Sequence, residues 1–311
     1  MKRVAVFGKR KLTIRESIYK YKSLYAIILV IMAYYMLIHY VPIVMGVMIS
    51  LKKMRIGSTI LGAKWVGFDN FKYVLKDDEI INVISNTLEI SALRLLVGFL
   101  PPIILAIFIF DIVVPSYKRT CQTIVYIPHF FSWVIVYGIF FAFFSGGGFV
   151  NGIRRSMGLD IKNFLMSVAW FRPLIVGSQV WKEVGWGTIL YLAALSAVDP
   201  QLFEAAIIDG AGPLRRIWII TLPAVLPVVT FTLIIRLGNI LNNDFEQILM
   251  FYNPAVYRVG DIIETWVYRV GLGSMQYGYG AAVSILKAGV SFILIAVANN
   301  LSRRLSGRSI W

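Results

Sequence analysis

Six runs of predominantly apolar residues limit what this chain can fold into. They lie near 23–51, 87–113, 121–144, 173–198, 217–241 and 280–300. Each run is long enough to cross a hydrocarbon core about 30 Å thick as a helix. Hydrophobic residues make up 58% of the 311 residues and charged residues 15%, against about 45–50% and about 25% in soluble domains. The sequence therefore predicts an all-α membrane protein with six transmembrane helices, and excludes most soluble enzymes.

The distribution of positive charge predicts how these helices are oriented. The chain carries 31 Lys and Arg against 16 Asp and Glu, and eight of the basic residues lie within 1–22, ahead of the first apolar run. Counted over the connecting segments, positive charge is about twice as dense on the side that holds residues 1–22. We therefore expect both termini in the cytoplasm, and we interpret the charge as a topological signal with no nucleic acid partner.

This pattern divides the chain into three parts. Residues 1–22 form a basic segment, in which Thr13 and Glu16 have the spacing of a capping box and predict a short helix on the membrane surface. The first apolar run is too long for a signal-peptide core and lacks a cleavage site, so it is expected to stay as a span. Residues 23–300 then form the six-span domain, and 301–311 form a cytoplasmic tail.

The loop between the fourth and fifth runs carries the strongest motif. Pro200 suits the start of a short helix over 201–209, and Gly210 and Gly212 allow a sharp turn before Pro213 opens the next helix. Small alanine side chains and two carboxylates then present a surface on which another protein could dock. An ordinary interhelical loop with a Gly-Pro turn is the alternative, and the spacing alone leaves both open.

This loop resembles the EAA motif of ABC importer permeases. The matching positions are Glu204, Ala205, Ala206, Asp209, Gly210, Ala211, Ile220, Leu222, Pro223 and Pro227. Ile217 replaces the usual phenylalanine of the motif. The segments WVGFDNF (65–71), NDFEQILMFYNPAVY (243–257) and DIIETWVYRVGL (261–272) are similar to the carbohydrate-uptake, maltose-type permeases and to their LplB-type branch, which is associated with oligosaccharide and polysaccharide-fragment import, including acidic glycans such as alginate oligosaccharides.

The resemblance implies a type I ABC importer permease fold and a non-catalytic role. The coupling helix would occupy 201–213, with Glu204 meeting an arginine of the ATPase and Gly210 forming the bend. The implied partners are a second, homologous permease subunit in a heterodimer, two ATPase subunits, an extracytoplasmic solute-binding protein, the carbohydrate and membrane lipid. The chain contains no G-x-x-x-x-G-K-[ST] sequence, so ATP and Mg²⁺ are expected on the ATPase subunits and no cofactor in this chain.

Polar residues inside the apolar runs predict a substrate pathway, because such residues are costly in a membrane and usually face a cavity or a partner. Arg236, Asn239 and Asn243 share one helical face, and Gln179, Glu183 and Trp186 share another. With the remaining polar and aromatic candidates, the predicted pathway residues are Glu89, Arg94, Gln179, Trp181, Glu183, Trp186, Arg236, Asn239, Asn243 and Lys287. Such a lining suits a sugar, whose hydroxyl groups need hydrogen bonds and whose C–H faces stack on aromatic rings.

The charges on this list allow two interpretations. If Arg94, Arg236 and Lys287 are unpaired near one cavity, they favour an anionic glycan. Alternatively, the cations pair with carboxylates such as Glu89 or with the partner chain, and Lys182 neutralises Glu183. His39 and His129 stand alone in the sequence, so core hydrogen bonding is expected for them, and no metal site is expected.

These observations together predict a permease subunit that imports an oligosaccharide across the cytoplasmic membrane by alternating access. The cations would favour an acidic oligosaccharide. Two other classes compete with the permease. A secondary transporter or channel would work without ATP, and a membrane enzyme acting on lipid-linked sugar would turn over alone. The register of the EAA motif argues against both classes, and the enzyme also lacks a pair of carboxylates or a histidine cluster at a membrane boundary.

Overall fold

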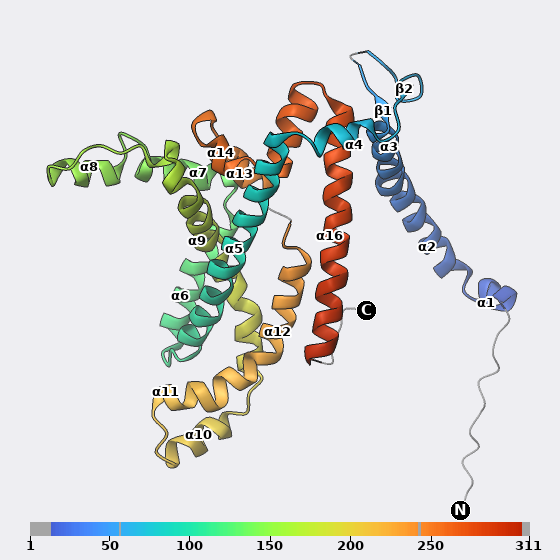
Figure 1. The fold of residues 1–311 in the computed structure, drawn as a ribbon. Helices are drawn as coiled ribbons and strands as arrows, with labels where there is room; N and C mark the ends of the chain where they lie inside the picture. The colour runs from blue at the N-terminus through green and yellow to red at the C-terminus, as the bar shows by residue number, and fades with distance from the viewer. Residues whose placement is uncertain (1–13, 56, 242–243, 307–311) are drawn as a thin grey trace, which may run out of the picture.

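The computed structural model describes residues 14–55, 57–241 and 244–306, which form an upright helical bundle with two projections (Figure 1). The strands within these ranges are β1 (Lys52–Lys53) and β2 (Lys64–Trp65), which pair as an antiparallel hairpin. All other regular elements are helical. In chain order these are α1 (Ile14–Lys20), α2 (Lys22–Tyr35), η1 (Met36–Tyr40), α3 (Val41–Ser50), α4 (Asp69–Val74), α5 (Asp78–Phe110), α6 (Pro115–Tyr126), η2 (Ile127–Phe130), α7 (Trp133–Phe144), α8 (Phe149–Ser156), η3 (Phe164–Met166), α9 (Val168–Ser196), α10 (Pro200–Ile208), α11 (Pro213–Arg216), η4 (Ile217–Thr221), α12 (Leu222–Gly238), α13 (Phe245–Phe251), η5 (Pro254–Val256), α14 (Tyr257–Gly260), α15 (Ile263–Trp266), η6 (Val267–Gly273) and α16 (Tyr277–Ser306).

Five helical segments of the described chain are long and apolar enough to cross a membrane. They are Lys22–Ser50, Asp78–Phe110, Trp133–Ser156, Pro213–Gly238 and Tyr277–Val297. A sixth arises if α9 and α10, which meet at a bend of 72°, are counted as one. The predicted all-α membrane class is therefore confirmed. The orientation of the termini stays a prediction.

The third predicted span, 121–144, is not a single helix. The structure ends α6 at Tyr126, inserts the short turn η2, and begins α7 after Ser132, whose hydroxyl caps the new helix. Pro128 lies in this break, where its missing N–H and its ring interrupt helical hydrogen bonding. α7 then runs on into α8, and the two project sideways from the bundle (Figure 1).

Two other prolines accompany wide π-helical turns. Pro42 follows η1 and Pro223 follows η4, each as the second residue of the next α-helix. A proline cannot donate to the carbonyl one turn earlier, and a π turn accommodates the disturbed pattern without ending the helix. The run predicted as 23–51 thus remains one continuous helical segment through α2, η1 and α3.

The core of the bundle is the pair α5 and α9, which pack together along their length (Figure 1). At one end Ile90 of α5 packs with Phe171 and Ile175 of α9, and at the other end Ile103 packs with Tyr191. α9 also passes close to α6 at Gly185, where a Cβ atom would lie 1.8 Å from the carbonyl oxygen of Val125. This close packing fixes the walls between which a cavity remains.

The ends of the chain are less enclosed. α1 lies within the basic segment 1–22, where a short helix was predicted, but Thr13 of the predicted cap lies outside the described residues. The position of this helix on the membrane surface stays a prediction. α2 is exposed throughout, and α3 lies beside α16 (Figure 1). α16 continues to Ser306, so the predicted tail begins as helix. Residues 307–311 lie outside the description.

Candidate functional site

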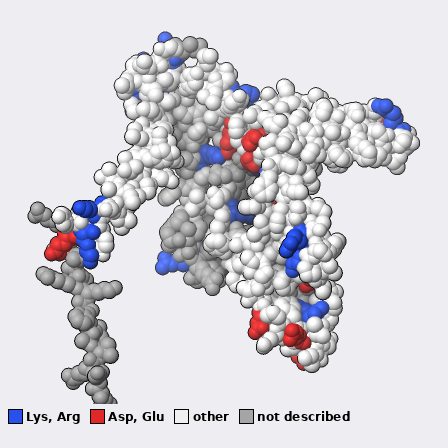
Figure 2. Space-filling view, turned by 180° about the vertical axis from the view of Figure 1, so that it is seen from behind, with Lys and Arg blue, Asp and Glu red and all other residues white. Residues whose placement is uncertain are grey.

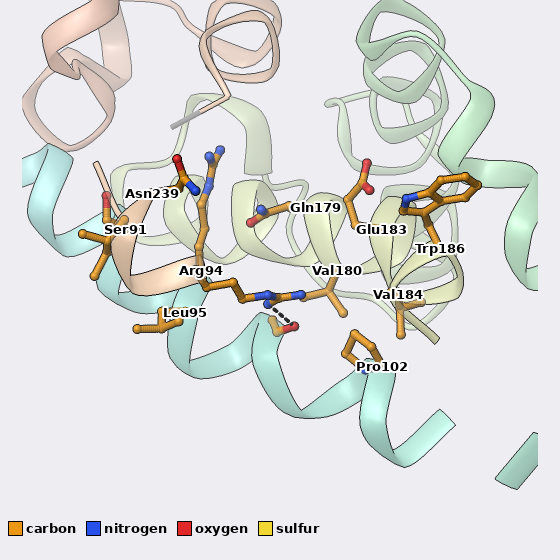
Figure 3. A pocket seen from close by; sticks show the side chains of 14 residues that line it. Ser91, Arg94, Leu95, Pro102, Gln179, Val180, Glu183, Val184, Trp186 and Asn239 are labelled. Carbon is orange, nitrogen blue, oxygen red and sulfur yellow. Dashed lines mark hydrogen bonds between the residues drawn. The ribbon is translucent and has the colours of Figure 1, made fainter. Parts of the chain in front are cut away.

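A cavity of about 310 Å³ lies between α5, α9 and α12. Its wall combines two arginines, one carboxylate, two amides and an indole with small apolar side chains, as Figure 3 shows. Six of the predicted pathway residues line it, and they are Arg94, Gln179, Glu183, Trp186, Arg236 and Asn239. The helical spacing in the sequence correctly placed Gln179, Glu183 and Trp186 on one face of α9.

Arg94 is buried and is held from the side away from the cavity. Its guanidinium donates to Oε1 of Gln247, a fully buried residue of α13. The Nε2 group of Gln247 donates in turn to the carbonyl oxygen of Ile175 and to Oγ of Ser178, both at 2.7 Å. Three helices, α5, α9 and α13, are thereby joined behind the cavity wall.

Arg236 reaches the cavity from α12 and ties that helix to α5. Its Nη1 donates to the carbonyl oxygen of Gly98 at 2.9 Å, and its guanidinium lies 5.6 Å from the ring centroid of Phe99. No ion pair of Arg94 or Arg236 with a carboxylate occurs within the described ranges. Neither guanidinium is in direct contact with a carboxylate, although the charges of Asp244 and Glu264 act on Arg94 from further away.

The carboxylate of Glu183, by contrast, is compensated. Nδ1 of His129 lies 2.8 Å from Oε2, and Nζ of Lys182 lies 3.2 Å from Oε1. Lys182 also donates to the carbonyl oxygen of His129 at 2.6 Å. The structure thus contains the ion pair of the alternative interpretation, in which Lys182 neutralises Glu183, although Glu183 also lines the cavity. His129, expected only to make core hydrogen bonds, is a second partner that joins the η2 break to α9.

Three of the other predicted pathway residues lie outside the cavity wall. Glu89 pairs with Arg172 of α9, so the alternative of pairing with Arg94 is wrong. Trp181 packs against Phe131 and Phe140, with ring centroids 6.5 and 6.2 Å apart, and does not line the cavity. Asn243 lies outside the described residues.

Lys287 corrects the expectation of three unpaired cations. It pairs with Glu264 of α15, and it does not line the cavity. The two residues are 23 positions apart on different helices, so no helical spacing could reveal the pair. Two arginines, without the lysine, supply the positive charge of the wall.

A second polar cluster lies at the end of the bundle near β1 and β2. Arg269 binds Glu79 and Asp261, each at 2.6 Å, and Asp261 accepts a hydrogen bond from Tyr252 at 2.8 Å. Burial and the neighbouring charge of Asp261 raise the pKa of Tyr252 far above its ordinary value. Burial opposes the charge of Arg269, but its hydrogen bonds to Asp261, Glu79 and Tyr252 outweigh that effect and raise its pKa. The cluster fixes the start of α5 against η6.

The loop with the EAA motif projects at the opposite end of the bundle (Figure 1). Asp199 caps α10 by accepting from the backbone N–H of Gln201 at 2.9 Å, and Pro200 is its first residue. The helix ends at Ile208, earlier than the predicted 201–213, because Gly210 adopts a left-handed backbone with φ of 76°. Ala211 then donates its N–H to the carbonyl oxygen of Ala206.

The surface of this loop is accessible for docking. Glu204, Ala205 and Asp209 are exposed, while Ala206 faces inward. Ile208 is 85% exposed and Trp218, beside the substituted Ile217, is 71% exposed, although both are large and apolar. Figure 2 shows acidic side chains at the same projecting end of the molecule, so the loop offers both charged and apolar surface to a protein partner. Phe203 meets Phe110 at the end of α5, with ring centroids 5.8 Å apart, which connects the loop to the bundle.

Comparison with known proteins identifies the family. Residues 99–307 match the family described as "Binding-protein-dependent transport system inner membrane component". The chain belongs to this family. Its members include permease proteins of transport systems, so this chain is a multi-pass, non-catalytic permease subunit of an ABC transporter.

Curated relatives within the family are similar over most of the chain. The Bacillus subtilis "Polygalacturonan/rhamnogalacturonan transport system permease protein YteP" is 40% identical over 93% of this chain and 90% of its own length. Protein LplB of the same organism is 40% identical over 93% of this chain and 91% of its own. The arabinooligosaccharides transport system permease protein AraP is 30% identical over 78% and 76%.

Two solved structures share the fold. A bacterial alginate ABC transporter, in complex with a periplasmic protein that holds an alginate pentasaccharide, contains a chain that matches with a TM-score of 0.87 and 36% identity over 96% of this chain and 99% of that one. A second structure, of a transporter that imports the acidic polysaccharide alginate, matches with a TM-score of 0.85 and 38% identity over 93% and 98%. The type I permease fold is thus established.

Proposed function

We propose that this chain is one of two permease subunits of an ABC importer that moves an acidic oligosaccharide into the cytoplasm. The observation that carries the proposal is the cavity between α5, α9 and α12, where Arg94 and Arg236 lack carboxylate partners among the described residues. One relative named for polygalacturonan and two structures named for alginate support the same substrate class.

The charge of the cavity favours a carboxylate. Its charged lining residues are Arg94, Arg236 and Glu183, and Glu183 is already paired with His129 and Lys182. The wall thus offers net positive charge in a region of low dielectric, where a uronate carboxylate is attracted more strongly than in water. Guanidinium groups also match the planar geometry of a carboxylate.

The neutral lining residues suit the remainder of a sugar. Gln179 and Asn239 carry amides that can both donate to and accept from hydroxyl groups. Trp186 is 47% exposed and offers a flat ring against the C–H face of a pyranose. The cavity volume of about 310 Å³ lies at the lower end of ligand sites. One or two sugar units of a longer chain would occupy it within this subunit.

The second part of the proposal is coupling through α10. Glu204, Ala205, Ala206, Asp209, Gly210 and Ala211 would form the surface that docks on a separate ATPase, which binds ATP and Mg²⁺. Because α10 follows α9 after a 72° bend and touches α5 through Phe203, a displacement of α10 would act directly on two walls of the cavity. ATP-driven closure would thus produce alternating access.

We also infer the assembly and its place in the cell. A second permease subunit would enclose the pathway from the other side, two ATPase subunits would bind the coupling loops, and an extracytoplasmic binding protein would deliver the sugar. The complex would reside in the cytoplasmic membrane with both termini of this chain inside, as the density of positive charge indicates.

Purification of the tagged chain from its native membranes tests the coupling. We expect a second permease and an ATPase to accompany the wild-type chain, and Glu204→Arg to lose the ATPase. Glu246→Arg is the matched control, since Glu246 is an exposed carboxylate on α13. If the chain emerged alone, or if Glu204→Arg retained the ATPase, a secondary transporter would explain the chain better. Sugar turnover by the isolated chain would favour the enzyme.

Transport into proteoliposomes tests the substrate class. The reconstituted complex, with its binding protein, should take up uronate oligosaccharides, and Arg236→Gln should lower this uptake relative to that of neutral oligosaccharides. An unchanged ratio in Arg236→Gln would contradict the acidic substrate, while leaving the coupling to the ATPase intact.

A further inference from the structure

The side-chain amide of Gln247 has its orientation fixed by its neighbours. Oγ of Ser178 donates to the carbonyl oxygen of Ile175 at 3.0 Å, so it must accept the hydrogen bond from Gln247. The amino group of Gln247 therefore faces Ser178 and Ile175, and Oε1 faces Arg94. A flipped amide would set N–H groups against a guanidinium and an oxygen against a carbonyl oxygen.

Two polar atoms at the cavity are left without partners by this arrangement. Nε of Arg94 and Oε1 of Gln179 are both buried and have no hydrogen-bond partner within the described part of the chain. Figure 3 shows the amide of Gln179 directed from α9 toward the arginine side chains. Buried donors and acceptors are rarely left unpaired, so we expect a partner such as water or a ligand to bind at these two positions.

We propose that Gln247 is a positioning residue that holds Arg94 so that its Nε–H and the Oε1 of Gln179 together receive the carboxylate and a hydroxyl group of an acidic sugar. This inference rests on the proposed function and adds to it the residues that select the anionic unit. Arg94 supplies the donor to the carboxylate, and Gln179 supplies the acceptor for the hydroxyl.

The polarity of the two atoms decides which ligand fits. A uronate presents a charged acceptor beside hydroxyl donors, so it satisfies both atoms, and its bond to the guanidinium is charge-assisted. A neutral sugar satisfies Gln179 equally well but offers Arg94 only a hydroxyl oxygen. Both atoms are covered in this structure, so a ligand must displace neighbouring side chains of the cavity wall to reach them.

Gln247 acts through Arg94 and does not itself face the cavity. A glutamate at this position would pair with Arg94 and cancel its charge, whereas a leucine would remove the acceptor and release the guanidinium. Both changes predict a loss of preference for the carboxylate. A purely structural role for Gln247 would instead weaken the binding of every sugar equally.

Equilibrium dialysis of the intact transporter complex in nanodiscs, without binding protein, separates these cases. The probes are a uronate tetrasaccharide of the alginate type and its carboxyl-reduced, neutral counterpart. We expect the wild-type complex to bind the uronate about 10-fold more tightly. Gln247→Glu and Gln247→Leu should bring the two Kd values within about two-fold of each other, with the neutral Kd unchanged.

Two controls keep the test decisive. Gln276→Glu makes the same chemical change at an exposed glutamine and should retain the preference. Ser178→Ala removes one of the two anchors of Gln247 without entering the cavity wall, and should give an intermediate preference if the buried variants fail to assemble. A wild-type preference that survives in the Gln247 and Ser178 variants would overturn this inference alone. Equal wild-type affinities would overturn the acidic substrate as well.

Discussion

The imidazole of His129 lies flat on the indole of Trp186, with ring centroids 4.3 Å apart and ring planes inclined by 5°. His129 belongs to the break between α6 and α7, whereas Trp186 belongs to α9 and lines the cavity. The same imidazole also binds Glu183 at 2.8 Å. His129, which lies outside the cavity, thus positions both the indole of Trp186 and the carboxylate of Glu183 in the cavity wall.

Replacing Trp186 by alanine should weaken sugar binding to the complex. Loss of the ring should cost about 1–1.5 kcal/mol, or roughly 10-fold in Kd, for acidic and neutral tetrasaccharides alike, because stacking does not depend on charge. Trp186→Phe should recover part of the affinity. Trp65→Ala removes an exposed indole from the hairpin and serves as the control. An unchanged Kd in Trp186→Ala would exclude the stacking role.

Replacing Lys182 by methionine should reduce the preference for acidic sugars. Nζ of Lys182 lies 3.2 Å from Oε1 of Glu183, and without it the carboxylate repels a uronate in the cavity. About 1 kcal/mol of repulsion corresponds to roughly a five-fold fall in uronate uptake relative to neutral uptake. The double variant Lys182→Met, Glu183→Gln should restore the ratio. Failure of the second change to restore it would show that Lys182 acts on packing instead.

Two glycines of α9 should respond in opposite ways to alanine. A Cβ at Gly185 would lie 1.8 Å from the carbonyl oxygen of Val125, whereas no atom lies within 4 Å of a Cβ at Gly177. Gly185→Ala should therefore destabilise the protein by about 1–3 kcal/mol. Gly177→Ala should stabilise it by up to about 1 kcal/mol through helix propensity. Thermal unfolding in detergent measures both, and a Gly185→Ala variant as stable as wild type would contradict the close contact of α9 with α6.

The turn after α10 offers a similar pair. Gly210 has φ of 76°, so Gly210→Ala should strain the turn by about 1 kcal/mol and lower transport-coupled ATPase activity. Gly212 has φ of −65°, which alanine adopts freely, and Gly212→Ala should keep that activity. ATPase activity stimulated by the loaded binding protein reports the difference. Equal activity in both variants would show that coupling tolerates a displaced loop.

Periodicity explains which parts of this molecule the sequence revealed. Residues of one helix face, such as Gln179, Glu183 and Trp186, were placed correctly because a helix repeats every 3.6 residues. The pair of Lys287 with Glu264 and the contact of Gln247 with Arg94 join separate helices, and their partners depend on tertiary packing. Gln247 lies between Glu246 and the apolar run 248–251, so nothing in the sequence marked it as the partner of Arg94.

The break in the third predicted span shows a different limit of prediction from the sequence. The run 121–144 is apolar throughout its second half, and hydropathy alone joins it into one helix. Pro128 was visible in the sequence, but its effect was not, because prolines interrupt some helices and are tolerated in others. Pro101 and Pro102 lie within α5 without ending it. The surroundings of each proline decide the outcome.

The wide turn η4 has a consequence for Arg236. A π turn contains one residue more than the α-helical turn it replaces, and each residue of an α-helix advances the direction of its side chain by about 100°. Because η4 spreads one turn over an extra residue, Arg236 lies about 100° short of the direction that a regular α-helix with the same residues from Pro213 would give it. Its direction into the cavity is set by a single extra residue at 217–221, close to the loop where the ATPase would dock. Deleting one residue within η4 would remove the wide turn and leave this arginine facing the site, whereas a regular α-helical turn that kept all five residues would rotate it away.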